Sequence, residues 1–162
     1  MKIAEKWEMI QQILKMAMKS SRHLSFATIA EDGSPHVTPI GSLILRDDCT
    51  GYYFEEYTKH MPAHFRNNQR VSILAVNSGF LFWLKSLFSG KFSTPPGIRL
   101  HGRVGERRPA TESEVITWQN RVKGARKTKG YKLIWKNLNH VRDIHFDSFE
   151  IITAGKMTSH LI

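Results

Sequence analysis

A short basic turn is the strongest candidate for binding chemistry in the sequence. Thr58, Lys59 and His60 stand directly before a polar, helix-like stretch, and Pro62 fits the first turn of a helix there. A helix start offers free backbone N–H groups, and the lysine and the hydroxyl add further donors, which together suit a phosphate. The turn therefore predicts an anion site. The alternative is a solvated lysine that merely opens a helix.

A second stretch, Thr38-Pro39-Ile40-Gly41, has unusual backbone chemistry. Proline and glycine both disturb strand pairing, so this stretch releases backbone donors and acceptors beside apolar side chains. A flat ligand requires such a slot, with polar groups at its edge. The alternative is that Pro39 and Gly41 only bend a strand.

The other reactive residue types form no catalytic pattern. His60 and His64 have the spacing of helical metal ligands, but no third ligand follows at a recognisable distance, so we predict no metal site. The only cysteine, Cys49, lies beside two aspartates, which raise the pKa of a thiol and leave it inert. Because neither a nucleophile elbow nor a triad is recognisable, we assign no catalytic residue.

The elements that must position these residues are mostly strands joined by tight turns. The Asp32-Gly33 dipeptide is a hairpin signal, and short turns between the first three strands favour an antiparallel meander over alternating β-α units. Several strands with few helices favour a small barrel. We expect a bend at Pro39 and Gly41 and a bulge near Asp147 and Ser148. The predicted strands cover 24–30, 36–46, 52–55, 71–76, 98–108 and 140–153.

Three helices are expected, at 3–19, 59–69 and 110–122. The first is amphipathic, and the last begins with a capping box formed by Thr111 and Glu114. The segment 80–96 contains five aromatic residues and is too apolar for an ordinary exposed loop. It could cover the barrel mouth, pack across a dimer, shape the substrate side of a site, or simply fill the core.

Length and charge limit the classes of function. The 162 residues suit one domain, and the net charge of +10 arises between residues 85 and 136, where 13 Lys/Arg face three acids. Such a field attracts polyanions, but the segment contains no recognisable nucleic-acid module, which argues against nucleic acid. With one cysteine, a charged N-terminus and no apolar stretch that spans a bilayer, we expect a soluble cytoplasmic protein.

Two blocks of the sequence resemble the pyridoxamine-phosphate-oxidase-like FMN-binding family. Residues 20–40, SSRHLSFATIAEDGSPHVTPI, are similar to the opening hairpin of that family. Residues 53–73, YFEEYTKHMPAHFRNNQRVSI, are similar to its second block, which is a strand, a phosphate-binding turn and a short helix. The resemblance covers residues 3–76 by motif and 98–153 by the order of elements.

The resemblance implies an antiparallel split β-barrel of the FMN-binding type, mainly β, with an N-terminal helix and peripheral helices. It also implies one domain over residues 1–162, a homodimer, and an FMN-dependent oxidoreductase that acts on an unidentified small molecule. Where the oxidases carry an arginine and a lysine for the phosphate, this chain has His60 and Met61, so we do not expect pyridoxamine-phosphate oxidase activity itself. The cofactor-binding residues would be Thr38, Pro39, Ile40, Gly41, Glu56, Thr58, Lys59 and His60.

Other functions remain open within the same resemblance. The split-barrel class includes haem-binding members. In this chain His101 or His145, together with the basic segment (residues 85–136), would hold haem. A non-catalytic FMN-binding module of the general-stress type is another alternative. A nucleic-acid binder is motivated only by the charge cluster and the aromatic residues.

Overall fold

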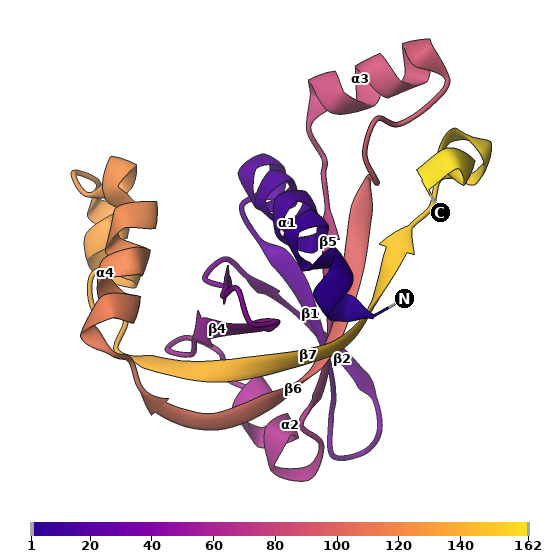
Figure 1. Cartoon of the computed structure of the whole chain (residues 1–162). Helices are drawn as coiled ribbons and strands as arrows, with labels where there is room; N and C mark the ends of the chain where they lie inside the picture. The colour runs from indigo at the N-terminus through magenta and orange to yellow at the C-terminus, as the bar shows by residue number, and fades with distance from the viewer. Residues whose placement is uncertain (1, 162) are drawn as a thin grey trace.

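The computed structural model describes residues 2–161, which form one curved seven-stranded sheet flanked by helices (Figure 1). Every pair of neighbouring strands is antiparallel, and the strand order is β2-β1-β5-β6-β7-β4-β3. The antiparallel pairing is as predicted, but the expected meander of the first three strands is wrong, because β2 and β4 do not pair with each other. The strands are β1 (Leu24–Ile29), β2 (Pro35–Ile40), β3 (Ile44–Leu45), β4 (Thr50–Phe54), β5 (Arg70–Val76), β6 (Gly97–Pro109) and β7 (His140–Ile152).

The two edge strands of the sheet, β2 and β3, are consecutive in the sequence. Only residues 41–43 separate them, so Ile40 and Ile44 lie at most roughly 14 Å apart. The sheet must therefore curl until its edges approach each other, which is the split-barrel architecture expected from the resemblance. We call residues 41–43 the seam. The single strand predicted over 36–46 is wrong, because the chain leaves the ladder at the seam and re-enters the sheet at its other edge.

The core lies between the N-terminal helix and the concave face of the sheet. A 3-10 turn (Ile3–Lys6) leads into α1 (Trp7–Ser21), whose apolar face is buried as its periodicity predicts. This face packs on β5 and β6 and shares one hydrophobic cluster with Phe26, Ile73 and Leu100. Within residues 2–161, no helix is long and apolar enough to cross a bilayer.

The remaining helices are short and peripheral. They are α2 (Met61–Asn67), α3 (Phe80–Ser89) and α4 (Glu112–Arg121), with a π-type turn at Tyr131–Trp135 and 3-10 turns at Lys123–Ala125, Gly155–Met157 and Ser159–Leu161. The predicted capping box is present, since the Thr111 hydroxyl accepts from the Glu114 N–H and the Glu114 carboxylate accepts from the Thr111 N–H. The predicted bulge is also present, because the pairing of β6 with β7 skips Asp147.

Residues 80–96, the aromatic segment, expose many of their apolar side chains. Its helix, α3, stands away from the body of the sheet (Figure 1). Only its inner side is packed, by Phe82 and Trp83 against Phe92. The other side is open to solvent, so packing accounts for Phe92 and the inner side of the segment but not for its outer side. The exposed apolar side chains are Phe80, Leu81, Leu84, Leu87 and Phe88.

Candidate functional site

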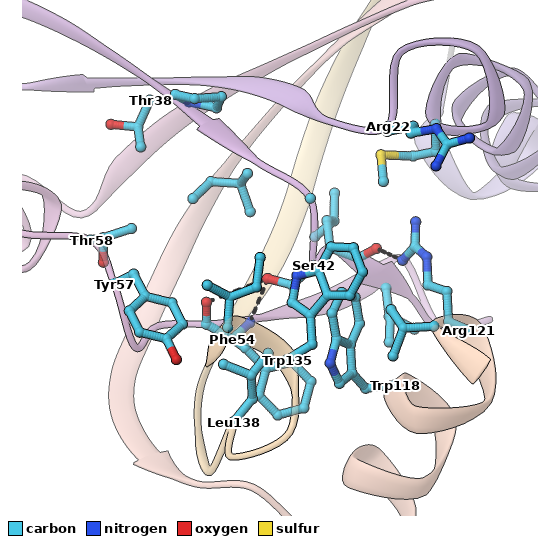
Figure 2. Close-up of a pocket in the computed structure, with 18 of the residues that line it drawn as sticks. Arg22, Thr38, Ser42, Phe54, Tyr57, Thr58, Trp118, Arg121, Trp135 and Leu138 are labelled. Atoms are coloured by element: carbon cyan, nitrogen blue, oxygen red, sulfur yellow. Dashed lines mark hydrogen bonds between the residues drawn. The ribbon is translucent and has the colours of Figure 1, made fainter. Parts of the chain in front are cut away.

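A cleft of about 1450 Å³ opens at the seam between the two edges of the sheet (Figure 2). Its walls come from α1, from β2 and the seam, from the turn after β4, and from α4 with the loop that follows it. Small-molecule sites commonly measure roughly 300–1,000 Å³. The cleft therefore has room for a cofactor together with a second molecule.

Seven of the eight residues predicted to bind a cofactor line this cleft. The curl of the sheet brings the end of β2 opposite the turn before α2, although the two are about 20 residues apart in the chain. The eighth residue, Glu56, lies apart, because its carboxylate accepts from the N–H groups of Asn139 and His140, each at 2.7 Å. Glu56 thus ties the turn after β4 to the start of β7. The seven cleft residues are Thr38, Pro39, Ile40, Gly41, Thr58, Lys59 and His60.

The hydroxyl of Thr58 has an unsatisfied hydrogen-bonding capacity. Its Oγ1 atom is buried and has no partner among the described residues. Leaving a buried hydroxyl unpaired costs about 1–3 kcal/mol, so such atoms in native proteins usually meet a ligand or a water. Because Lys59 and His60 follow directly and also line the cleft, a phosphate placed here would meet a hydroxyl donor and a cation together.

The charges around the cleft all have one sign. Of the described residues, no aspartate or glutamate lines it, whereas five lysines and arginines do. Arg121 donates a hydrogen bond to the seam carbonyl of Leu43 and remains exposed to the cleft. The protein around it desolvates the guanidinium, which lowers the pKa of Arg121. Such a surface attracts anions. The five cations are Lys15, Lys19, Arg22, Lys59 and Arg121.

One wall of the cleft is aromatic. Trp118 on α4 packs against Phe54, with ring centroids 5.8 Å apart, and against Trp135, with centroids 6.3 Å apart (Figure 2). Only 3% of Trp118 is exposed, and its Nε1 atom has no hydrogen-bond partner among the described residues. The sequence did not indicate this wall, because Trp118 and Trp135 belong to neither family motif. The only nearby signal was the capping box that begins α4.

Histidines gather at the end of the cleft near Thr58. His36 and His60 line it with ring centroids 5.8 Å apart, and His64 lies behind them, 5.0 Å from the His36 ring. His64 is buried and bonded through Nδ1 to the Thr28 hydroxyl at 2.9 Å. Burial, and then the neighbouring histidines, lower the pKa of His64 and keep it neutral. Across residues 2–161, no group of three or more His, Cys, Asp or Glu is arranged to hold a metal ion.

The remaining candidate residues lie outside the cleft. His101 on β6 contacts Glu150 through Nε2 at 3.0 Å, and His145 on β7 is exposed on the strand pair opposite Arg103. Burial, followed by the charge of Asp48, raises the pKa of Cys49, in agreement with the inert thiol expected from the sequence.

A curled antiparallel sheet with its edges meeting at a seam is a split-barrel fold, and the cleft at this seam carries charges that attract anions. The family model of pyridoxamine 5'-phosphate oxidase matches residues 10–145, and the chain belongs to this family. No curated protein resembles the sequence closely enough to count as a match.

Solved structures share the fold at low sequence identity. HupZ of Group A Streptococcus is 17% identical with a TM-score of 0.59, over 91% of this chain and 94% of that one. An FMN-binding protein of Syntrophomonas wolfei subsp. wolfei is 13% identical with a TM-score of 0.57, over 94% and 95%. HutZ, the haem storage protein of Vibrio cholerae, is 11% identical with a TM-score of 0.56, over 88% and 94%. At these identities the likeness establishes the fold alone.

Proposed function

We propose that the cleft binds FMN, with the phosphate beside Thr58, Lys59 and His60 and the ring against residues 38–41. The observation that carries this proposal is the buried, unpartnered Thr58 hydroxyl in a cleft whose charged lining residues are all basic. A phosphate supplies the acceptor that this hydroxyl lacks and the negative charge that the cleft attracts.

The ring slot is supported by the position of β2. As an edge strand, β2 pairs only with β1, so the backbone groups on its other side are free for a ligand. Pro39 supplies an exposed apolar surface, Ile40 beside it is buried in the core, and the ladder stops at Gly41. This combination fits the polar edge and the flat body of an isoalloxazine.

We further propose that the protein is an FMN-dependent oxidoreductase that acts on a small molecule. The whole chain would form one FMN-binding domain, and two copies would form a homodimer. Bound flavin supplies hydride transfer. The residues of this chain hold the ring on β2, balance the phosphate charge with Lys59, and leave the open side of the cleft for substrate. No side chain is assigned as an acid or a base. Light scattering that gave the 18.7 kDa of a monomer in the presence of FMN would contradict the homodimer.

The decisive experiment is a titration of the purified protein with FMN, in which the quenching of flavin fluorescence measures binding. Lys59→Ala should weaken binding by roughly 1.5–3 kcal/mol, about ten- to a hundredfold, since it removes a charged phosphate contact. The matched control is Lys156→Ala, an exposed lysine away from the cleft. Failure of the wild type to bind FMN, or a Lys59→Ala affinity within twofold of it, would refute the placement.

Haem binding is the second candidate. It is favoured by the shared fold with the haem storage protein HutZ and by His36 and His60 in the cationic cleft. The histidines that the sequence suggested, His101 and His145, do not line the cleft, so they are weaker candidates for an iron ligand. An absorbance spectrum distinguishes the cofactors, because a Soret band that His36→Ala or His60→Ala abolishes would favour haem. Bound FMN without any measurable turnover of substrate would favour the alternative of a non-catalytic FMN-binding module.

The basic segment provides a prediction about rates. If the lysines around Lys127 and Lys129 steer the anionic cofactor, the FMN association rate should fall as salt rises and as both residues are reversed to glutamate. If the FMN association rate measured by stopped flow is the same at all salt concentrations and in the double variant, electrostatic steering is wrong. Duplex DNA binding that persists above roughly 0.3 M salt would instead support a nucleic-acid partner.

A further inference from the structure

Helix α3 carries an apolar face that stays exposed to solvent. Its five exposed apolar side chains fall within about 120° of one another when residues are spaced about 100° apart around the helix. Phe82, which packs on Phe92, lies on the opposite side of the helix, so the exposed face points away from the body of the protein. We call this surface the outer face of α3, and it consists of Phe80, Leu81, Leu84, Leu87 and Phe88.

The body of the protein holds α3 with this face outward. The Trp83 Nε1 atom donates to the carbonyl of Asn77 at 2.6 Å, and the N–H of Ser78 donates to the hydroxyl of Ser20 at the end of α1, at 3.0 Å. These bonds tie the start of α3 to the sheet and to α1. Single exposed apolar residues are ordinary, but a contiguous apolar patch marks an interaction surface. The outer face therefore calls for a partner.

The charges beside the outer face are all positive. Lys85 lies on α3 itself, Lys91 follows the helix directly, and Lys156 lies in the 3-10 turn whose Met157 carbonyl accepts from the N–H of Phe92 at 3.0 Å. All three lysines are exposed, and none takes part in an ion pair among residues 2–161. The sequence has no aspartate or glutamate from residue 57 to 105 or after residue 150. The partner is therefore expected to be anionic as well as apolar.

Size and shape favour a lipid surface over a protein partner. A standard protein interface uses about 20–30 residues on each side, whereas the outer face offers five side chains on a helix that projects from the body (Figure 1). A bilayer needs no matching groove. A helix with phenylalanine and leucine on one face and lysine beside it lies in the plane of the membrane, with its apolar face roughly 5–10 Å into the boundary between headgroups and acyl chains.

We propose that the outer face of α3 binds the protein to the surface of a membrane that contains anionic lipids. The phenylalanines and leucines enter the boundary between headgroups and acyl chains, and Lys85, Lys91 and Lys156 meet the lipid phosphates. The helix lies on the bilayer and does not cross it. This interaction is separate from the cleft, because no residue of the outer face lines the cleft, and it does not depend on the proposed FMN function.

The test is flotation of the purified protein with lipid vesicles. Vesicles of seven parts phosphatidylcholine to three parts phosphatidylglycerol should bind the protein at least tenfold more tightly than vesicles of phosphatidylcholine alone. Leu81→Ser and Phe88→Ser should each weaken binding at least tenfold, because each removes apolar surface that the bilayer buries. The matched control is Leu133→Ser, since Leu133 is 75% exposed against 76% for Leu81 but lies in the turn bonded to α4. Binding that Leu81→Ser and Leu133→Ser weaken equally, or that neither weakens, would overturn the proposal.

A second arm tests the charges beside the outer face. Lys85→Gln and Lys91→Gln should each weaken binding to the mixed vesicles about fivefold and leave binding to pure phosphatidylcholine unchanged. The rival surface is the basic loop after α4, which the double variant Lys127→Glu, Lys129→Glu reverses. If vesicle binding depends on this loop and not on Leu81, the protein adsorbs through the loop and the proposal is wrong.

A third arm tests insertion and self-association. A tryptophan introduced by Phe88→Trp should be quenched by vesicles that contain brominated phosphatidylcholine, whereas adsorption by charge alone would leave it unquenched and contradict the proposal. Without vesicles, Phe88→Ser should have the same mass as the wild type in light scattering. A lower mass would show that the outer face pairs with a second copy of the chain. Unchanged FMN binding by Phe88→Ser shows that the variant is folded, and a failure of vesicle binding alone leaves the proposed function in place.

Discussion

Two groups of arginines in this protein differ in what surrounds them. Arg46 and Arg108 each contact the carboxylates of both Glu114 and Asp143, at distances of 2.6–3.0 Å. Arg22 and Arg121, which line the cleft and are here called the cleft arginines, have no carboxylate partner among the described residues. The first group joins the turn after β3, the end of β6, the start of α4 and β7, whereas the second faces an open cavity.

The difference separates arginines that join elements of the fold from arginines for which we propose a role in ligand binding. In the network, the hydrogen bonds from Arg108 are the main reason that the pKa values of Glu114 and Asp143 fall to about 2. Those charges are already balanced and attract little else. In the cleft, no carboxylate of the described residues balances the positive charge, and this is the reason for proposing an anionic ligand there. Variants of the paired arginines should therefore change stability, and variants of the cleft arginines should change binding.

The largest effect is expected at the most buried ion pair. Arg142 donates from Nε to both oxygens of Glu55 at 2.7 Å, and both residues are less than 10% exposed. Arg142→Met would leave the buried Glu55 carboxylate with the Tyr53 hydroxyl at 3.0 Å and the more distant Arg107 at 3.9 Å, at a cost of about 3–5 kcal/mol in the free energy of unfolding. Urea denaturation measures this loss. The double variant Arg142→Met, Glu55→Gln should recover part of it, and a double variant as unstable as the single would contradict the explanation.

A smaller loss is expected in the partly exposed network. Asp143→Asn removes the charge that Arg46 and Arg108 share, and hydrogen bonds to charged groups contribute about 1.5–3 kcal/mol. Asp147→Asn on the same strand is the control, since its contact with Arg70 is exposed and worth about 0–1 kcal/mol. Equal losses in the two variants would show that the network has no special role in stability.

The same network predicts an acid dependence of stability. The pKa values of Glu114 and Asp143 lie below their ordinary values of 4.5 and 3.8. Their stabilising contribution is therefore complete above about pH 5 and declines as the pH falls from there toward 2. The free energy of unfolding measured between pH 6 and 3 should fall less steeply in Asp143→Asn than in the wild type. Parallel curves for the two proteins would disprove this origin of the acid dependence.

Local sequence patterns predicted much of the fold, because their causes are local. The apolar spacing of α1, the Asp32-Gly33 hairpin, the capping box of α4 and the bulge at Asp147 all follow from neighbouring residues. The split of the strand at the seam was missed, since it depends on which edge of the sheet residue 44 joins. The exposure of α3 was also left open, because hydrophobic spacing does not show whether a partner surface exists.

The candidate site divides in the same way. Its motif residues, such as Thr38 and Lys59, were found in consecutive stretches, and the curl of the sheet brings them together. The cleft arginines and Trp118 were not found, because Arg121 meets the seam at Leu43, 78 positions earlier in the chain. Pairing is equally non-local: Arg46 contacts Asp143 at a separation of 97 residues. Counting residues therefore predicts the net charge, but it does not predict which lysines and arginines pair with carboxylates.

The smallest expected change in stability gives the strictest test of the comparison. Arg121→Gln removes a cation that has no carboxylate partner among the described residues, together with its hydrogen bond to the carbonyl of Leu43, because the glutamine side chain is shorter. The loss of this one hydrogen bond should lower the free energy of unfolding by about 1 kcal/mol. Arg108→Gln, the same substitution in the network, should cost about 1.5–3 kcal/mol because it breaks charged hydrogen bonds to Glu114 and Asp143. Urea denaturation of both variants at pH 7 and low salt makes the comparison direct. If Arg121→Gln proves as destabilising as Arg108→Gln, Arg121 stabilises the fold. The distinction between arginines paired with carboxylates and arginines available for a ligand is then wrong.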